Sequence, residues 1–261
     1  MSKVLDLFAA AHGQCRLTYV SATQIKLAPF NGRNLAIAGL LQQVPSAGVT
    51  ASNSGLSANT VYYVYAYMSS GAMALEMSAT GHSQDATTGV ETKTGDTSRT
   101  LVGMIAANAS SQFQDGGGLL GVLSYFNRRR RVSGAYFTAS RALSATTATE
   151  FASEIRVSFL CWADEQIAAR ANGGIWASTA GPGYAYIGID TNSQSDSGGG
   201  IGATGSQVPF SAEYTAGGLT EGATHFATLY GIAASGGTIT MTGNATQAAG
   251  QRTSLTVAVM G

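Results

Sequence analysis

Four consecutive arginines, Arg128 to Arg131, form the densest charge cluster in the chain. Clustered guanidinium groups neutralise phosphates, so one interpretation is a nucleic-acid site. The rest of the chain argues against it, because 14 basic residues balance 14 acidic ones and the isoelectric point is near 6.8. Nucleic-acid-binding domains are usually basic, with isoelectric points above about 9. We therefore predict that the run is a linker clamp at a domain or subunit junction, that it pairs with carboxylates of a neighbouring subunit, and that nucleic acid is not a partner.

The three histidines, His12, His82 and His225, lie far apart in the sequence. None falls in an H-x-x-x-H or H-E-x-x-H frame that would hold a catalytic metal. We expect His82 to be a polar loop residue between strands. His225 begins an apolar segment, and we expect it to be hydrogen-bonded and half-buried.

Carboxylates that are close in sequence could pair for glycoside hydrolysis, a mechanism that depends on their separation in space. The available pairs are Asp164 with Glu165, Glu150 with Glu154, and Glu213 with Glu221. Acidic residues are few and no catalytic motif surrounds them, so we expect ion pairs with Arg156, Arg170 or Arg252 instead. The sequence also lacks a nucleophile elbow, a P-loop and a Rossmann fingerprint. We predict neither an enzyme nor a cofactor.

Residues 190–196 alternate oxygen-bearing side chains, as a calcium loop does. Ser195, however, stands where an EF-hand needs glycine, and Ile201 stands where it needs a bidentate glutamate. We therefore expect a polar hairpin loop and no metal site.

Aromatic residues in the second half offer a surface for carbohydrate. Tyr184 and Tyr186 could stack on a sugar ring, while Asp190 and Asn192 bond its hydroxyls. In a strand both tyrosines would share one face, because side chains alternate between the two faces. That face is either exposed and binds a glycan or belongs to the core, and the sequence leaves both open.

Cys15 and Cys161 stand far apart, in no metal-binding spacing. We expect two buried free thiols. A disulfide that forms after release into an oxidising medium is the alternative.

Charged residues make up 11% of the chain, against about 25% in an ordinary soluble domain. A monomer normally stays soluble through a mixed, charged surface and a net charge away from zero. This chain has neither. We expect much of its surface to be buried against other copies or in a larger particle, as in a structural or assembly protein.

Short segments rich in β-branched and aromatic residues, separated by turn signals, predict an all-β fold. Val61 to Met68 is the strongest of them, and we expect a central, buried strand there. The last segment, Thr253 to Val259, is expected to insert into a sheet, as in a jelly roll. Other predicted strands cover 16–20, 24–28, 34–37, 73–78, 89–93, 99–106, 154–162, 174–177, 184–190, 224–232 and 238–242, while 142–152 is ambiguous between helix and strand. The predicted organisation is an attachment segment (1–13), a β-sandwich or barrel domain (14–132) and a jelly-roll-like β-sandwich (133–261).

The N-terminal segment predicts a short helix over 4–11, with Leu5, Leu7 and Phe8 as its apolar contacts. A helix of this length is marginal alone, so we expect it to dock onto a particle. No window approaches the roughly 18 apolar residues of a membrane span. Asp6 and the short apolar run argue against a secretory signal, so we expect synthesis in the cytoplasm and no membrane insertion.

Short blocks of the first half, at 21–27, 62–67 and 96–104, resemble fibre, spike and decoration-type structural proteins of tailed bacteriophages. The end of the chain, 249–257, resembles the compact jelly-roll heads that such proteins carry. These proteins are typically homotrimers, so the resemblance implies copies packed around a three-fold axis, which buries apolar surface.

These observations together predict a non-enzymatic virion protein, assembled in the host cytoplasm. It would attach to other virion proteins by its N-terminal segment and display its C-terminal domain, with a host-surface glycan as a candidate ligand. One alternative is a glycan depolymerase or hydrolase, which needs a cleft with two carboxylates. The other is a free lectin, which needs a sugar-binding monomer.

Overall fold

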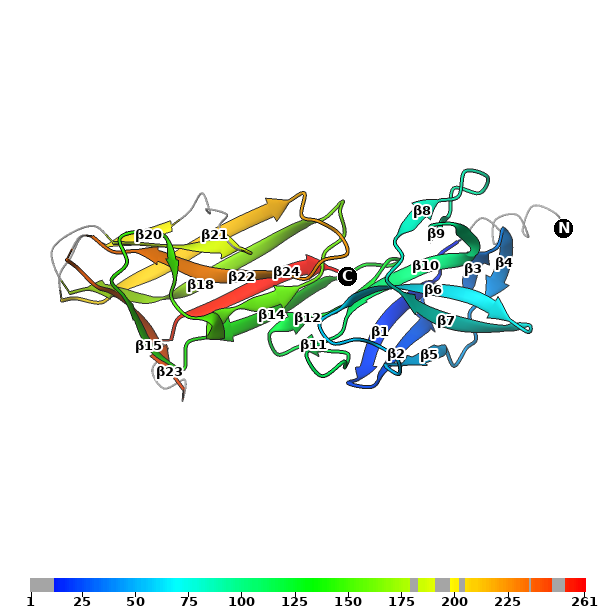
Figure 1. Ribbon diagram of the computed structural model, residues 1–261, viewed down its shortest axis with the longest axis horizontal. Coiled ribbons are helices and arrows are strands. Elements are labelled where there is room, and N and C mark those ends of the chain that lie inside the picture. The colour runs from blue at the N-terminus through cyan, green and yellow to red at the C-terminus, as the bar shows by residue number, and fades with distance from the viewer. Residues whose placement is uncertain (1–11, 179–182, 191–197, 202–204, 235, 246–251) are drawn as a thin grey trace.

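The computed structural model describes residues 12–178, 183–190, 198–201, 205–234, 236–245 and 252–261. Among these residues, a single 3-10 turn, Ser153–Ile155 (η1), has helical geometry, and strands make up most of the rest. The predicted all-β fold class is confirmed. Figure 1 shows two lobes along the longest axis, with the C-terminal end of the chain lying between them.

The N-terminal lobe contains two small sheets and one larger sheet. The small sheets are β1 (Cys15–Ser21), β2 (Gln24–Pro29) and β5 (Val49–Ser52), in that order, and β3 (Asn34–Ile37) with β4 (Leu40–Gln43). The larger sheet has the order β7 (Ala72–Ser78), β6 (Val61–Ser69), β10 (Asp96–Ala106), β9 (Glu91–Lys93), β8 (His82–Gln84), and β13 (Val122–Ser124) also pairs with β10. The predicted strand at 61–68 is central, as expected, and is fully buried only over Val64 to Ala66.

The C-terminal lobe contains two larger sheets. The first has the order β11 (Asp115–Gly116), β12 (Leu119–Leu120), β17 (Val157–Phe159), β22 (His225–Ile232), β19 (Gly183–Ile189), β20 (Gly198–Ile201), and β16 (Thr149–Glu150) also pairs with β22. The second has the order β14 (Arg130–Tyr136), β24 (Ser254–Met260), β18 (Gln166–Ala177), β23 (Ile239–Asn244), β15 (Ala139–Leu143), and β21 (Val208–Gly217) also pairs with β18.

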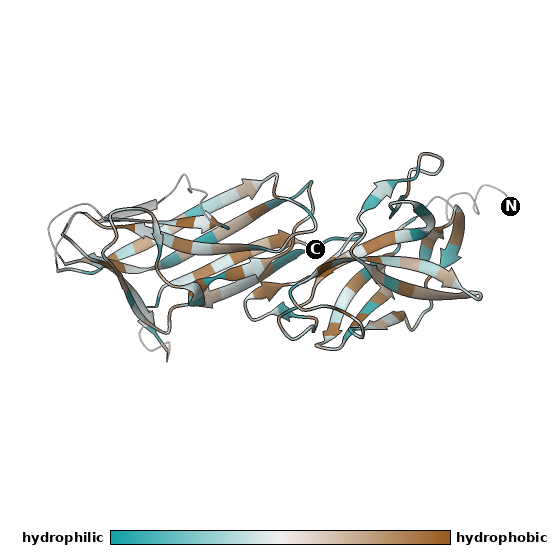
Figure 2. Cartoon of the chain, viewed as in Figure 1, coloured by the Kyte–Doolittle hydropathy of each residue, from teal (hydrophilic) through white to brown (hydrophobic). Residues whose placement is uncertain are grey.

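These two sheets form a jelly-roll-like β-sandwich. Strands such as β18 and β21 alternate between core and solvent, whereas β19 and β22 are buried over most of their length. In β18, Ile167 and Ala169 are buried while Ala168 and Arg170 are exposed. Apolar and polar bands alternate along the strands in Figure 2. The C-terminal strand β24 lies between β14 and β18, as predicted, because its alternate residues enter the core.

Several observed strands were not predicted, among them the short β4, β5 and β8. The first eight residues of β18 and the whole of β21 were not predicted, because alanine, serine and glycine carry little strand signal. The ambiguous segment 142–152 contains the end of β15 and the short β16 and no helix.

One strand that precedes the predicted domain boundary pairs with a strand that follows it. Residues 115–120 were assigned to the first domain, yet β12 pairs in parallel with β17 of the C-terminal lobe. The boundary at 132/133 therefore stays a prediction. The predicted attachment helix, with Leu5, Leu7 and Phe8, lies outside the described residues.

Candidate functional site

The arginine run lies where the chain passes from β13 of the N-terminal lobe to β14 of the C-terminal lobe. The Arg128 guanidinium donates to Asp164 at 2.7 Å and lies 5.1 Å from the ring centroid of Trp162. Arg131 pairs with Asp115 and also donates to the carbonyl of Val122. These two arginines therefore bind carboxylates of their own chain, and the expectation that their partners belong to a neighbouring subunit was wrong for them.

Arg129 and Arg130 are exposed. The backbone of Arg129 exchanges two hydrogen bonds with Gly261, which ties the run to the end of the chain. A contact with a neighbouring subunit stays a prediction for these two side chains.

His82 lies at the junction between the lobes and bridges two carboxylates. Its Nδ1 is 2.7 Å from Glu91 Oε2 on β9, and its Nε2 is 2.7 Å from Glu221 Oε1. Glu221 belongs to the C-terminal lobe, where its other oxygen accepts the backbone N–H of Ala163 at 3.0 Å. The expectation of a polar loop residue was wrong: His82 begins β8, and its partner Glu221 is distant in sequence, which no local pattern could reveal.

Three aromatic rings surround the imidazole of His82. The ring centroids of Tyr63, Tyr125 and Trp162 lie 5.4, 6.3 and 6.4 Å from it. Trp162 is only 1% exposed and belongs to a core cluster that also includes Tyr65 of the N-terminal lobe. We call His82, Glu91, Glu221, Tyr63 and Trp162 the junction cluster.

The electrostatics of the junction cluster favour a charged imidazole. The hydrogen bond that the imidazole donates to Glu221 raises the pKa of His82 above its ordinary value, and Glu91 adds to this against the opposing effect of burial. Burial alone would raise the pKa of Glu221, but hydrogen bonds from His82 and from the Ala163 amide bring it below its ordinary value. Burial raises the pKa of Tyr63 to about 12, so its hydroxyl stays protonated.

The predicted glycan-contact residues do not form one exposed surface. Tyr184 is 50% exposed, but Tyr186 is 9% exposed and stacks on Tyr230, with ring centroids 6.0 Å apart. The Asp190 carboxylate is 2.8 Å from His225 Nδ1, and Asn192 lies outside the described residues. Sequence reasoning missed Tyr230, which is the cross-strand neighbour of Tyr186.

His225 itself is hydrogen-bonded, as predicted, but more deeply buried than expected. Its Nε2 lies 2.8 Å from the carbonyl oxygen of Thr220, and the residue is buried.

Two of the three arginines named as partners for the carboxylates, Arg156 and Arg170, form ion pairs. Glu150 accepts two hydrogen bonds from Arg156, at 2.7 and 2.6 Å, and Glu213 pairs with Arg170 at 3.2 Å. Arg252 instead lies over the Tyr136 ring, 3.6 Å from its centroid.

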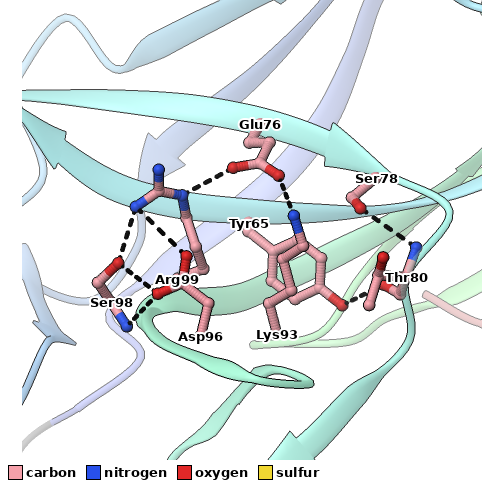
Figure 3. A network of polar contacts seen from close by, with 8 residues as sticks. All are labelled: Tyr65, Glu76, Ser78, Thr80, Lys93, Asp96, Ser98 and Arg99. Atoms are coloured by element: carbon pink, nitrogen blue, oxygen red, sulfur yellow. Dashed lines mark hydrogen bonds and ion pairs between the residues drawn. The ribbon is translucent and has the colours of Figure 1, made fainter.

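A further ion-pair network, not predicted, lies in the N-terminal lobe (Figure 3). The Glu76 carboxylate accepts from Lys93 at 2.5 Å and from Arg99 at 2.7 Å. Arg99 also donates to Ser98, which in turn bonds Asp96. The cations hold the pKa of Glu76 below its ordinary value, although burial opposes them. The network joins β7, β9 and β10 through the Glu76 carboxylate.

Cys15 and Cys161 are free and buried, which confirms the prediction. Among the described residues, no group of three or more His, Cys, Asp or Glu side chains could hold a metal ion. The same part of the chain contains no helix long and apolar enough to cross a membrane. The predicted polar loop at 190–196, apart from Asp190, lies outside the described residues.

Comparison with known proteins gives no family for this chain. No family model and no curated protein matches it. Among solved structures it is similar to the insecticidal delta-endotoxin Cry8Ea1 from Bacillus thuringiensis, at 8% identity and a TM-score of 0.25, with 93% of this chain and 51% of the toxin covered. It is also similar to a protein of infectious bursal disease virus strain Gx, at 10% identity and a TM-score of 0.26, with 94% of this chain and 73% of the viral chain covered. The chain thus spans about half the length of the toxin.

Proposed function

We propose that this protein is a non-enzymatic structural component of a virion, of the fibre, spike or decoration type, and that it works as a homotrimer. Its segment 1–13 would attach to other virion proteins, and its C-terminal lobe would be displayed. The observation that supports this proposal is the solvent-facing side of the sheet β14-β24-β18-β21, which we call the outer face.

The outer face has small, mostly uncharged side chains where an independent monomer would carry many charges. By strand register, two neighbouring rows of side chains cross its centre, Val132, Ala258, Ala168 and Thr215 in one and Gly134, Thr256, Arg170 and Glu213 in the other. Ala258 is already buried, at 7% exposure. Val132 is 55% exposed, and Met260 and Tyr136 at the ends of the face are also exposed. Antiparallel sheets that face water usually alternate apolar and polar residues cleanly. An exposed Val and Met among Ala, Thr and Gly therefore favours a covered face.

A second copy of this chain suits the outer face. Small residues leave a hollow of about 260 Å³, bordered by Arg130, Arg170 and Glu213. The face carries both signs of charge, so the arginines of one copy can meet the glutamate of the next. Such burial would also account for the low charge content, because copies around a symmetry axis hide neutral surface.

Mutation of Ala168 tests this proposal. Ala168→Glu fills the hollow with a larger, charged side chain that blocks the close approach of a second copy. We expect a trimeric mass for the wild type and a monomeric mass for the variant, by size-exclusion chromatography with light scattering. Ala72→Glu is the matched control, because Ala72 is an exposed strand alanine in the other lobe, and it should stay trimeric. Circular dichroism would verify that both variants fold.

A wild-type protein that is monomeric at every concentration, or an Ala168→Glu variant that stays trimeric, would overturn this use of the outer face. Labelled antibody against the protein, imaged on purified particles, tests the virion role separately. Absence from every particle fraction would refute it.

A further inference from the structure

His82 has both ring nitrogens on carboxylate oxygens, at 2.7 Å each. A neutral imidazole has one N–H donor and one acceptor, and an ionised carboxylate only accepts. Both contacts can be hydrogen bonds only when the ring carries two protons. We propose that His82 is a proton-controlled latch between the two lobes, which binds Glu91 and Glu221 together when doubly protonated and releases Glu221 when it loses one proton.

The two contacts of His82 join different parts of the molecule. Glu91 pairs with Gln84 on the β8–β9 hairpin that also carries His82, so this contact stays within one hairpin. Glu221 lies 139 positions away in sequence, in the other lobe. The contact with Glu221 is therefore the one that ties the lobes, and the hairpin contact remains available to a singly protonated ring.

Other charged groups around His82 already have partners. On the N-terminal side, Lys93 lies opposite His82 in the strand register but binds Glu76. On the C-terminal side, Arg128 binds Asp164. Tyr63 donates its hydroxyl to Glu221 and stays protonated, as described above. The proton that changes near neutral pH is therefore the one on His82.

The direction of the pH effect follows from the raised pKa of His82 in the folded chain. The latch contributes its full stabilisation below the ordinary imidazole pKa of about 6.5. That stabilisation is lost as the pH rises through the higher pKa of the folded state. Beyond it, the lone pair of a ring nitrogen faces the Glu221 carboxylate, this tie between the lobes is lost, and the packing around Trp162 loosens. This inference does not depend on the proposed virion role.

Trp162 gives a built-in probe of the latch, since its ring lies 6.4 Å from that of His82 and is 1% exposed. The chain has two tryptophans, so Trp176→Phe leaves Trp162 as the only indole. In this background we expect a red shift of the emission and increased acrylamide quenching as the pH rises through the titration of His82. NMR of the three histidine rings gives that titration directly.

Substitutions separate the latch from other titrations. His82→Gln should abolish the fluorescence transition, whereas His225→Gln, at a histidine bonded within the C-terminal lobe, should leave it in place. If His82→Gln does not fold, Glu221→Gln serves instead and should move the His82 midpoint back toward about 6.5. The latch is refuted if His82 titrates without any change at Trp162, if the transition survives His82→Gln, or if Glu221→Gln leaves the midpoint unchanged.

Discussion

Replacing Gly103 with alanine should disrupt the packing of the N-terminal lobe. Gly103 lies in β10, and a Cβ added there would be 2.4 Å from Leu17 Cδ2 and 2.5 Å from the Leu123 carbonyl oxygen. Ordinary contacts between non-bonded carbon atoms are about 3.5–4.0 Å. The neighbours would therefore have to move by about 1 Å to restore ordinary contact.

Neither neighbour can move cheaply. Leu17 is buried in the lobe's core, and Leu123 belongs to β13, which pairs with β10 beside Gly103. Overpacking of this kind typically costs about 1–3 kcal/mol. We expect Gly103→Ala to lower the free energy of unfolding by about 2–3 kcal/mol, the upper part of that range, because one obstructing atom is backbone.

Urea denaturation followed by circular dichroism measures this change. Gly81→Ala is the matched control, because its nearest atom is Tyr63 Cε2 at 4.0 Å and its φ is not in the left-handed region. Alanine there should be neutral or stabilising by up to about 1 kcal/mol, through the lower entropy of the unfolded chain. Equal stability of the two variants would refute the close approach of β1 and β13 to Gly103.

Two further predictions concern ionisable side chains. Cys15 and Cys161 should not react with Ellman's reagent in the native protein, because burial raises the pKa of each thiol to about 12. Both should react in denaturant, and reaction of either thiol in the native protein would contradict its burial. Burial alone would raise the pKa of Glu150, but hydrogen bonds from Arg156 and Thr228 bring it below its ordinary value. The stabilisation that ionised Glu150 gives the fold is therefore present above the ordinary pKa and is lost as the pH falls through the pKa of the folded state. Glu150→Gln should therefore cost about 1–2 kcal/mol near neutral pH and flatten the acid side of a plot of melting temperature against pH, whereas an unchanged acid limb would contradict the pairing.

The fold class could be predicted because strand signals are local. Val61–Met68 is a continuous run of mostly β-branched and aromatic residues. In Thr253–Val259 every second side chain is apolar and lies on a face that must be buried. Strands with low β-propensity show where local strand signals fail. β21 alternates Phe210 and Ala212 with Ser211 and Glu213, and its small residues find their strand only by pairing with β18.

The arginine run shows how much a charge cluster in the sequence can predict about its contacts. Its position between β13 and β14 and the pairing of Arg128 with Asp164 agree with a junction that binds carboxylates. Sequence could not tell that the carboxylates belong to the same chain, since 36 positions separate the two residues.

The sequence by itself determined an all-β chain, two buried thiols and an inserted C-terminal strand, since these depend on side-chain size, polarity and alternation along a few consecutive residues. Only the tertiary structure decided that His82 meets Glu221 and that Tyr186 stacks on Tyr230. Each contact joins segments that lie far apart in the chain. These side chains come together through strand pairing and sheet packing, which a pattern of a few consecutive residues does not predict.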